Sequence, residues 1–137
     1  MGKNDIIHLF EAHDVRPTAN RIIIAEALID AGRPVSLTEL EEMLDTIDKS
    51  VIYRTLAAFR GKRLVHVIED GSEGVRYELC HSHDCHHDDD QHAHFYCEVC
   101  HKTYCLEDVP APEVTLPEGF EKQSVNYVIK GVCPDCR

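Results

Sequence analysis

The chain has 137 residues, 43% of them hydrophobic, and no stretch reaches the run of about 18 apolar residues that a membrane-spanning helix needs. This length and composition predict one globular domain or two small ones, and residues 1–10 lack the apolar core of a signal peptide. The formal net charge of −11 excludes nucleic-acid binding through the overall field, so DNA binding would need a local basic face.

Four helices are predicted within residues 1–61, each beginning at a residue whose side chain can cap free backbone N–H groups. The capping residues are Asn4, Thr18, Ser36 and Asp48, and Glu39 follows Ser36 as in a capping box. The predicted helices span 4–13, 18–31, 36–44 and 48–61. In the second helix, the residues predicted to face the core are Ile22, Ile23, Ala25, Ala27, Leu28 and Ile29.

After the fourth helix the period of the pattern changes. Residues 64–68 and 75–79 read as short strands, and the turn-rich segment 70–74 between them predicts a β-hairpin. Helices followed by such a hairpin are the layout of a winged helix-turn-helix domain, with 48–61 as recognition helix and 64–79 as wing.

The remaining chain is predicted to be a small β domain that follows a loop rich in His, Asp and Cys at 80–91. Three prolines exclude a continuous helix in 109–119. The expected strands are 92–97, 102–106 and 124–132. The fold class is therefore α+β, with a winged helix over 1–79, a hinge loop over 80–91 and a β domain over 92–137.

The acidic residues are concentrated in the second part. Residues 1–79 hold 10 Lys and Arg against 14 Asp and Glu, whereas the remainder holds 4 against 11. The His and Cys residues also gather there, as expected if bound cations offset the negative charge.

Two Cys-x2-Cys pairs carry the clearest chemical signal. Cys97 and Cys100 form one pair, Cys133 and Cys136 the other, and the 32 residues between them must fold back to bring the pairs together. Zinc takes four ligands tetrahedrally, and four thiolates leave no open position for water or substrate. The pattern therefore predicts a structural zinc site, with disulfides or redox centres as the alternative. Seven cysteines, an odd number, favour reduced thiols in a cytoplasm.

Basic and polar residues on two helices form a candidate DNA-binding face. Lysine, serine and arginine near a helix N-terminus can reach phosphates or base edges, and a tyrosine can contact thymine methyl groups. In the fourth helix the candidates are Lys49, Ser50, Tyr53 and Arg54, with Arg60 on the same outer face. At the start of the second helix they are Arg16, Asn20 and Arg21. The alternative is an ordinary charged, solvated face.

Four segments together resemble the ferric uptake regulator (Fur) family of bacterial metal-sensing repressors. They are residues 16–21 (RPTANR), 50–56 (SVIYRTL), 92–100 (HAHFYCEVC) and 133–136 (CPDC). The similarity runs through nearly the whole chain, and the combination of the third segment with the second is highly specific.

The resemblance implies a homodimer that binds palindromic double-stranded DNA operators when metal is loaded. It implies no enzyme activity, no small-molecule substrate and no membrane association. Residues 92–137 would then be the metal-binding and dimerisation domain, with structural zinc on the four cysteines. His92 and His94 would belong to the sensing site.

Three positions depart from the family pattern. Pro34 stands where iron- or peroxide-sensing members typically draw a histidine from the linker before the third helix, so an iron-type site lacks a ligand. The proline-rich segment 109–119 replaces a long helix that usually contributes to the dimer. Val125 falls near a further family histidine, so one accessory metal site is expected to be absent.

The sensory site is expected to combine His66, Cys80, His92 and His94, a set that resembles the zinc uptake regulators of the family. A thiolate with imidazoles suits tetrahedral zinc, whereas iron(II) sensing usually relies on nitrogen and oxygen ligands. Zn²⁺ is therefore the favoured regulatory metal and Fe²⁺ the alternative. Further candidate ligands are Glu78, Cys105 and Glu107.

Several of these residues have simpler explanations. His66 could face solvent on its strand, and Cys80 or Cys105 could be a small buried thiol. The loop over 81–90 could collect metal at low affinity or be only a solvated acidic loop.

The predicted function is a zinc-dependent repressor of zinc-uptake genes, in which metal clamps the two domains at one angle. One alternative is an iron(II)- or peroxide-responsive repressor of the same family. Another is a zinc-buffering protein or metallochaperone that uses the loop over 81–90. A zinc hydrolase is disfavoured, because the sequence has no His-Glu-x-x-His or similar open three-ligand motif.

Overall fold

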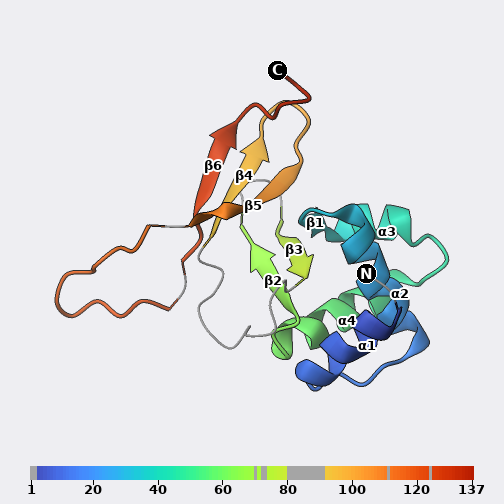
Figure 1. Cartoon of the computed structure of the whole chain (residues 1–137). Helices are drawn as coiled ribbons and strands as arrows, with labels where there is room; N and C mark the ends of the chain where they lie inside the picture. The colour runs from blue at the N-terminus through green and yellow to red at the C-terminus, as the bar shows by residue number, and fades with distance from the viewer. Residues whose placement is uncertain (1–2, 70, 72–73, 80–91, 111, 124) are drawn as a thin grey trace.

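The computed structural model describes residues 3–69, 71, 74–79, 92–110, 112–123 and 125–137. The helices and the first three strands lie together, and the last three strands form a second body beside them (Figure 1). The elements are α1 (Lys3–Ala12), α2 (Ala19–Ala31), β1 (Val35–Ser36), α3 (Leu37–Met43), α4 (Lys49–Gly61), β2 (Val65–Ile68), β3 (Arg76–Leu79), β4 (His92–Cys97), β5 (Thr103–Pro110) and β6 (Val128–Gly131). The predicted α+β class with an N-terminal winged helix is confirmed, while the loop over 80–91 lies outside the described residues.

The four helices begin and end within one residue of their predicted bounds. The hydroxyl of Thr18 accepts a hydrogen bond from the Arg21 N–H, and the Asp48 carboxylate accepts one from the Ser50 N–H, so both act as N-caps. Ser36 and Glu39 form the predicted capping box at the start of α3. Asn4 is the exception, because α1 begins at Lys3 and Asn4 lies inside it.

The core of the helical body takes most of its buried side chains from α1, α2 and α4, and the ring centroids of Phe10 and Phe59 lie 5.6 Å apart within it. Ile24 is fully buried, whereas Ile23 is 41% exposed, so the predicted inward face of α2 was wrong at this position. Residues 22–29 are almost all apolar, so the pattern does not distinguish the side of the helix that faces the core from the side that faces solvent.

The predicted hairpin is present as β2 paired antiparallel with β3, with Val65 opposite Leu79 and Ile68 opposite Arg76. Strand β1 was not predicted. It pairs with the other edge of β3 and makes the sheet order β1-β3-β2. A strand of two residues has no period that a sequence pattern could reveal.

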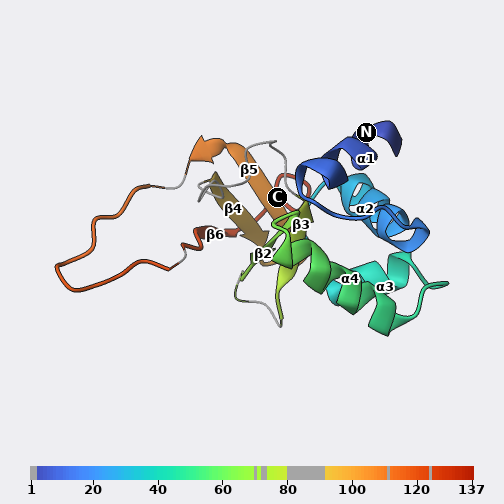
Figure 2. The same ribbon diagram turned by 90° about the horizontal axis from the view of Figure 1, so that it is seen from below.

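The second sheet has the order β5-β4-β6, with β5 antiparallel and β6 parallel to the central β4. Strand β5 runs on to Pro110, beyond its predicted end, whereas β6 is shorter than predicted. Between them, residues 112–123 project away from both sheets (Figures 1 and 2). No helix is described within 112–123, in agreement with the prolines there.

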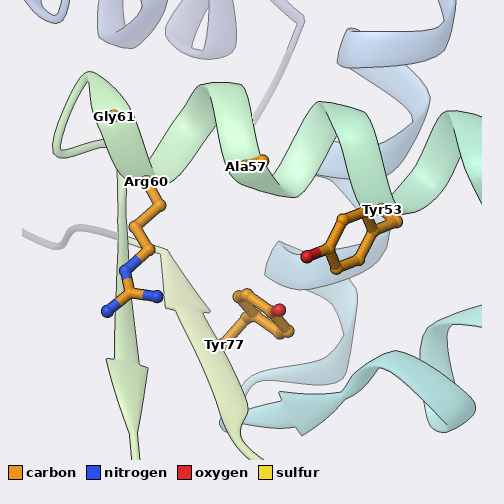
Figure 3. Close-up of a pocket in the computed structure, with 5 residues that line it drawn as sticks. All are labelled: Tyr53, Ala57, Arg60, Gly61 and Tyr77. Atoms are coloured by element: carbon orange, nitrogen blue, oxygen red, sulfur yellow. The ribbon is translucent and has the colours of Figure 1, made fainter.

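Strand β3 lies between the two bodies and contacts both. Its Tyr77 side chain points toward α4 (Figure 3), and by strand alternation Arg76 and Glu78 point the other way. Both of these residues make hydrogen bonds to the second body, Arg76 to His101 and Glu78 to His94. Among the described helices, none combines the length and the apolar character needed to cross a membrane.

Candidate metal centres and DNA-binding face

The two Cys-x2-Cys pairs meet at one end of the second sheet. Cys97 ends β4, and the parallel pairing of β4 with β6 sets Cys97 opposite Gly131, two residues before Cys133. The four Sγ atoms lie within 4.8 Å of one another, with Cys100 Sγ and Cys133 Sγ 3.8 Å apart. The backbone N–H groups of Cys100 and Cys133 donate to Cys97 Sγ over 3.5 and 3.4 Å. We call this group the four-cysteine cluster.

The surroundings of the cluster favour thiolate at two of its members. Hydrogen bonds from backbone N–H groups, first that of Cys100, lower the pKa of Cys97 to about 6. A hydrogen bond from the Tyr104 hydroxyl lowers the pKa of Cys133. The hydrogen bond between Cys136 and the Cys133 sulfur raises the pKa of Cys136 to about 12, so a metal entering here would displace that proton.

The donor set of the cluster fits a tetrahedral metal ion of the zinc type, with every position filled by a thiolate. None of these four cysteines is joined by a disulfide in the described part of the chain, so their sulfurs are available as ligands.

A second group of possible ligands, Glu78, His94 and Cys105, bridges the two bodies, and we call it the bridging cluster. One ligand atom from each residue lies within 4.8 Å of the others. Glu78 comes from β3, whereas His94 and Cys105 face each other across the β4–β5 pair. The distance from His94 Nε2 to Glu78 Oε2 is 2.8 Å, and both side chains are at least 95% buried. A buried carboxylate, imidazole and thiol can together hold a divalent metal ion.

The bridging cluster contains only part of the predicted sensory set. His94 is in it, joined by Glu78 and Cys105, which the sequence offered only as further candidates. His66 is outside this group but lies directly opposite Glu78 in the β2–β3 ladder, so the two side chains share one face of the hairpin. Cys80 and the side chains of His92 and Glu107 lie outside the described residues.

The candidate DNA-binding residues of α4 lie on its exposed face. Tyr53 is 58% exposed, and Lys49 and Arg54 are also exposed. The Ser50 hydroxyl donates to Asp48 Oδ1 over 2.7 Å, so it is engaged in the helix cap. At the start of α2, Arg16 and Asn20 are exposed, and Arg21 is half-buried and donates to the Arg16 carbonyl oxygen over 3.1 Å.

A hollow of about 400 Å³ lies between α4 and β3, next to this face (Figure 3). Its lining residues are Tyr53, Ala57, Arg60, Gly61 and Tyr77. Burial raises the pKa of Tyr77, so its hydroxyl stays protonated and can donate a hydrogen bond. Among the described residues, the lining offers one guanidinium and two hydroxyls but no carboxylate, which suits an anion. Tyr77 was not among the predicted residues, although alternation along the wing strand could have suggested that it faces α4.

Comparison with known proteins agrees with this architecture. The model of the Ferric uptake regulator family matches residues 12–126. One similar solved structure is a zinc uptake regulator complexed with zinc and DNA, with 19% identity, a TM-score of 0.71, and coverage of 98% of this chain and 91% of that chain. Holo XcZur has 22% identity, a TM-score of 0.66, and 98% coverage of both chains.

The ferric uptake regulator of Helicobacter pylori, described as having three functional metal binding sites, has the same fold at 17% identity. Its TM-score is 0.61, with 99% of this chain and 94% of that chain covered. A comparison with curated protein sequences gave no match. Because the family model covers most of the sequence, this chain belongs to the ferric uptake regulator family, whose members are metal-responsive transcriptional regulators.

Proposed function

We propose that this chain is a DNA-binding repressor that responds to zinc and represses zinc-uptake genes in the cytoplasm. The observation that carries the proposal is the bridging cluster, because its three side chains come from both bodies of the molecule. The fold shared with a zinc uptake regulator bound to zinc and DNA supports it. The domain division at 1–79, 80–91 and 92–137 is part of the same proposal.

The bridging cluster offers a direct physical route from metal to DNA. When Glu78 shares a metal ion with His94 and Cys105, strand β3 is held against β4 and β5. The wing and α4 then keep one orientation relative to the second sheet, whereas without metal they sample several. In a homodimer that orientation sets the spacing of the two recognition helices, which must match the half-sites of a palindromic operator. Metal and operator therefore strengthen each other's binding.

Each of the two clusters is assigned a different zinc ion. The four-cysteine cluster is closed and lies at the end of the second sheet, so we assign it a permanent structural zinc. The bridging cluster has three described donors of three different kinds, and we assign it the regulatory zinc. Zinc binds oxygen, nitrogen and sulfur donors, so it suits such a mixed set. The candidates for additional donors are His66, Cys80, His92 and Glu107.

Iron(II) remains the second candidate for the regulatory metal, because Glu78 and His94 supply the oxygen and nitrogen donors that it prefers. The Cys105 thiol favours zinc. Pro34, in the place of a sensor histidine of iron-type members, also argues against iron.

The DNA-binding face is assigned to Lys49, Ser50, Tyr53 and Arg54 of α4, together with Arg16, Asn20 and Arg21. The hollow beside α4 extends this face. The Arg60 guanidinium and the hydroxyls of Tyr53 and Tyr77 suit one phosphate group of the DNA backbone, which would fix the register of the helix in the groove.

Fluorescence anisotropy of a candidate palindromic operator at fixed salt tests the proposal. Protein holding only its structural zinc is titrated under buffered free zinc and, anaerobically, under buffered iron(II). We expect operator affinity to rise with zinc by about 5- to 150-fold, the usual range of allosteric coupling.

A rise in operator affinity with iron(II) alone would show that the regulatory metal is iron(II) instead of zinc. Affinity that is unchanged by either metal would refute the metal-dependent repressor. Several loosely bound zinc ions without DNA affinity would instead favour the buffering protein.

Dimerisation is assigned to the apolar surface of the second body. Large hydrophobic side chains that are 39–68% exposed gather on β5, on the projecting segment 112–123 and around β6. They are Val109, Val114, Leu116, Phe120, Val125, Tyr127, Ile129 and Val132. A surface of this kind marks an interaction site, and a second copy of the chain is the occupant we propose.

Phe120→Glu is therefore expected to weaken the dimer. Phe120 is 68% exposed, and an aromatic anchor of this kind contributes about 2 kcal/mol, counted twice in a two-fold interface. The dissociation constant should rise by roughly 1,000-fold, as measured by sedimentation velocity over a concentration series. Phe120→Leu keeps the site apolar and should remain mostly dimeric. An unchanged dimer in Phe120→Glu would place the interface elsewhere.

A further inference from the structure

Arg76 makes a second buried polar contact between the two bodies, beside that of Glu78 with His94. It lies on β3 and is 6% exposed. Its Nη1 donates to Glu39 Oε1 in the helical body, and its Nη2 donates to the His101 carbonyl oxygen in the second body, both over 2.6 Å. A planar guanidinium can hold two such partners at once in a fixed geometry, which makes Arg76 a bridge rather than a surface ion pair.

The anchor of Arg76 in the helical body is well defined. Glu39 is the third residue of α3 and also completes the capping box with Ser36. Its other carboxylate oxygen accepts from Arg33 over 2.7 Å. Although burial opposes ionisation, Arg33 and Arg76 hold the pKa of Glu39 below its ordinary value. The carboxylate is therefore charged at neutral pH, and the start of α3, which packs on α4, is tied to Arg76.

The anchor in the second body belongs to the turn of the four-cysteine cluster. His101 follows Cys100 directly and has a positive φ of 62°. Its backbone N–H donates to the Cys97 carbonyl oxygen over 2.9 Å, and its Nδ1 lies 2.9 Å from the Tyr96 hydroxyl. Arg76 thus contacts a carbonyl group whose position is determined by the cysteine turn, not by the regulatory site.

Arg76 and Glu78 are two residues apart on β3, so their side chains share one face. Glu78 contacts His94 on β4, and Arg76 contacts the turn after β4. A single orientation of the two bodies therefore satisfies both contacts, and a rotation that opens the bridging cluster would also strain the Arg76 bridge.

We propose that Arg76 is a positioning residue that locks β3 and α3 onto the cysteine turn in the orientation in which the bridging cluster is assembled. The inference rests on the proposed metal-dependent DNA binding for its consequence, but the bridge itself does not require the regulatory metal. Without metal, Arg76 narrows the range of orientations that the two bodies sample but does not fix one, and through Glu39 it transmits the metal-fixed orientation to α3 and so to α4.

Loss of the bridge should reduce the coupling between zinc and operator. In Arg76→Met, β3 can be held by zinc while α3 and the cysteine turn move independently. We expect the gain in operator affinity on adding zinc to fall by about 5- to 10-fold. Arg76→Lys keeps the charge but reaches only one partner, so its coupling should lie between those of Arg76→Met and the wild type.

Arg33→Met is the matched control, because Arg33 contacts the same Glu39 carboxylate, while its polar contacts among the described residues stay within the helical body. Its zinc-dependent gain should stay within about 2-fold of the wild type, below the range of mutations that carry coupling. Glu39→Gln should reduce the gain, and the double variant Glu39→Gln with Arg76→Met should be no worse than Arg76→Met alone, as expected for two residues of one bridge. Circular dichroism and one retained structural zinc per chain identify the variants that are folded.

Small-angle X-ray scattering without DNA supplies a readout that does not depend on the proposed function. With the regulatory metal removed, Arg76→Met should have a larger radius of gyration per protomer than Arg33→Met, because its two bodies separate. Equal scattering curves and equal zinc-dependent gains for the two variants would overturn the proposal. If the wild type shows no zinc response, the proposed function fails, and the scattering comparison still decides whether Arg76 positions the two bodies.

Discussion

Replacing Cys133 with serine is expected to remove the structural zinc and to unfold the second body. Within the described part of residues 92–137, the buried hydrophobic side chains are Ala93, Cys97 and Cys133, and two of these three are members of the four-cysteine cluster. Three short strands with so small an apolar core cannot offset the conformational entropy of folding by packing alone. The metal must therefore supply much of the stability.

The expected effect is large because zinc bound to sites of this kind contributes roughly 10–16 kcal/mol of binding free energy, comparable with the whole stability of a small domain. Serine oxygen is a poor zinc ligand at neutral pH, so the remaining three thiolates should lose the metal to a competing chelator. The Cys133→Ser protein should hold no tightly bound zinc. It should also lose its operator binding, because β3 no longer has a folded partner.

Zinc per chain, measured by elemental analysis after dialysis against a chelator, is the direct test, and the loss of β structure is followed by circular dichroism. Cys105→Ser is the matched control, since Cys105 lies on the same sheet but outside the four-cysteine cluster. It should retain one zinc per chain and its fold. A folded Cys133→Ser protein that keeps its zinc would show that the cluster is not the structural site.

The features that could be predicted from the sequence are those encoded by neighbouring residues. The caps at Thr18, Ser36 and Asp48 depend on side chains that accept hydrogen bonds from backbone N–H groups within three residues, so the sequence predicts them. The two Cys-x2-Cys pairs are equally local, and zinc chemistry explains why they should meet. The buried face of α2 was harder to predict, because Ile22, Ile23 and Ile24 are all apolar.

The features that could not be predicted depend on contacts distant in sequence. The sequence named Glu78 and Cys105 only as further candidate ligands. They join His94 because β3 packs against the β4–β5 pair, and no local spacing encodes that packing. The Arg76 bridge joins positions 39, 76 and 101. In the sequence alone, Arg76 resembles any exposed charged residue of a wing strand, because its burial depends on how the two bodies pack together. Whether Cys80 and His92 add to the regulatory site is still a prediction.

Glu78→Gln is expected to abolish the zinc-dependent gain in operator affinity while leaving the structural zinc in place. Glutamine has nearly the same shape and can still bond to His94, so the packing of β3 should survive. It lacks the negative charge that a divalent ion needs from this buried position. Since loss of a mere hydrogen-bond partner of a metal ligand costs about 10- to 100-fold in metal affinity, loss of the ligand itself should cost at least about 100-fold.

The measurement combines zinc competition against a chromogenic chelator with anisotropy of the operator at buffered zinc. Wild type should bind two zinc ions per chain, and Glu78→Gln should bind one in the same range. Its operator affinity in the presence of zinc should equal that of the wild type without regulatory zinc. His94→Gln should behave in the same way, whereas His8→Gln, a change on the exposed side of α1, should match the wild type in both assays.

His66→Gln decides the composition of the site. His66 lies opposite Glu78 in the hairpin but outside the bridging cluster. If His66 completes the zinc site, its variant should lose zinc affinity as strongly as Glu78→Gln. If Glu78, His94 and Cys105 act without it, His66→Gln should keep most of its zinc-dependent gain. A full zinc-dependent gain in operator affinity in both Glu78→Gln and His94→Gln would contradict the regulatory role of the bridging cluster. Metal would then act on DNA binding without the contact that joins the wing to the second sheet.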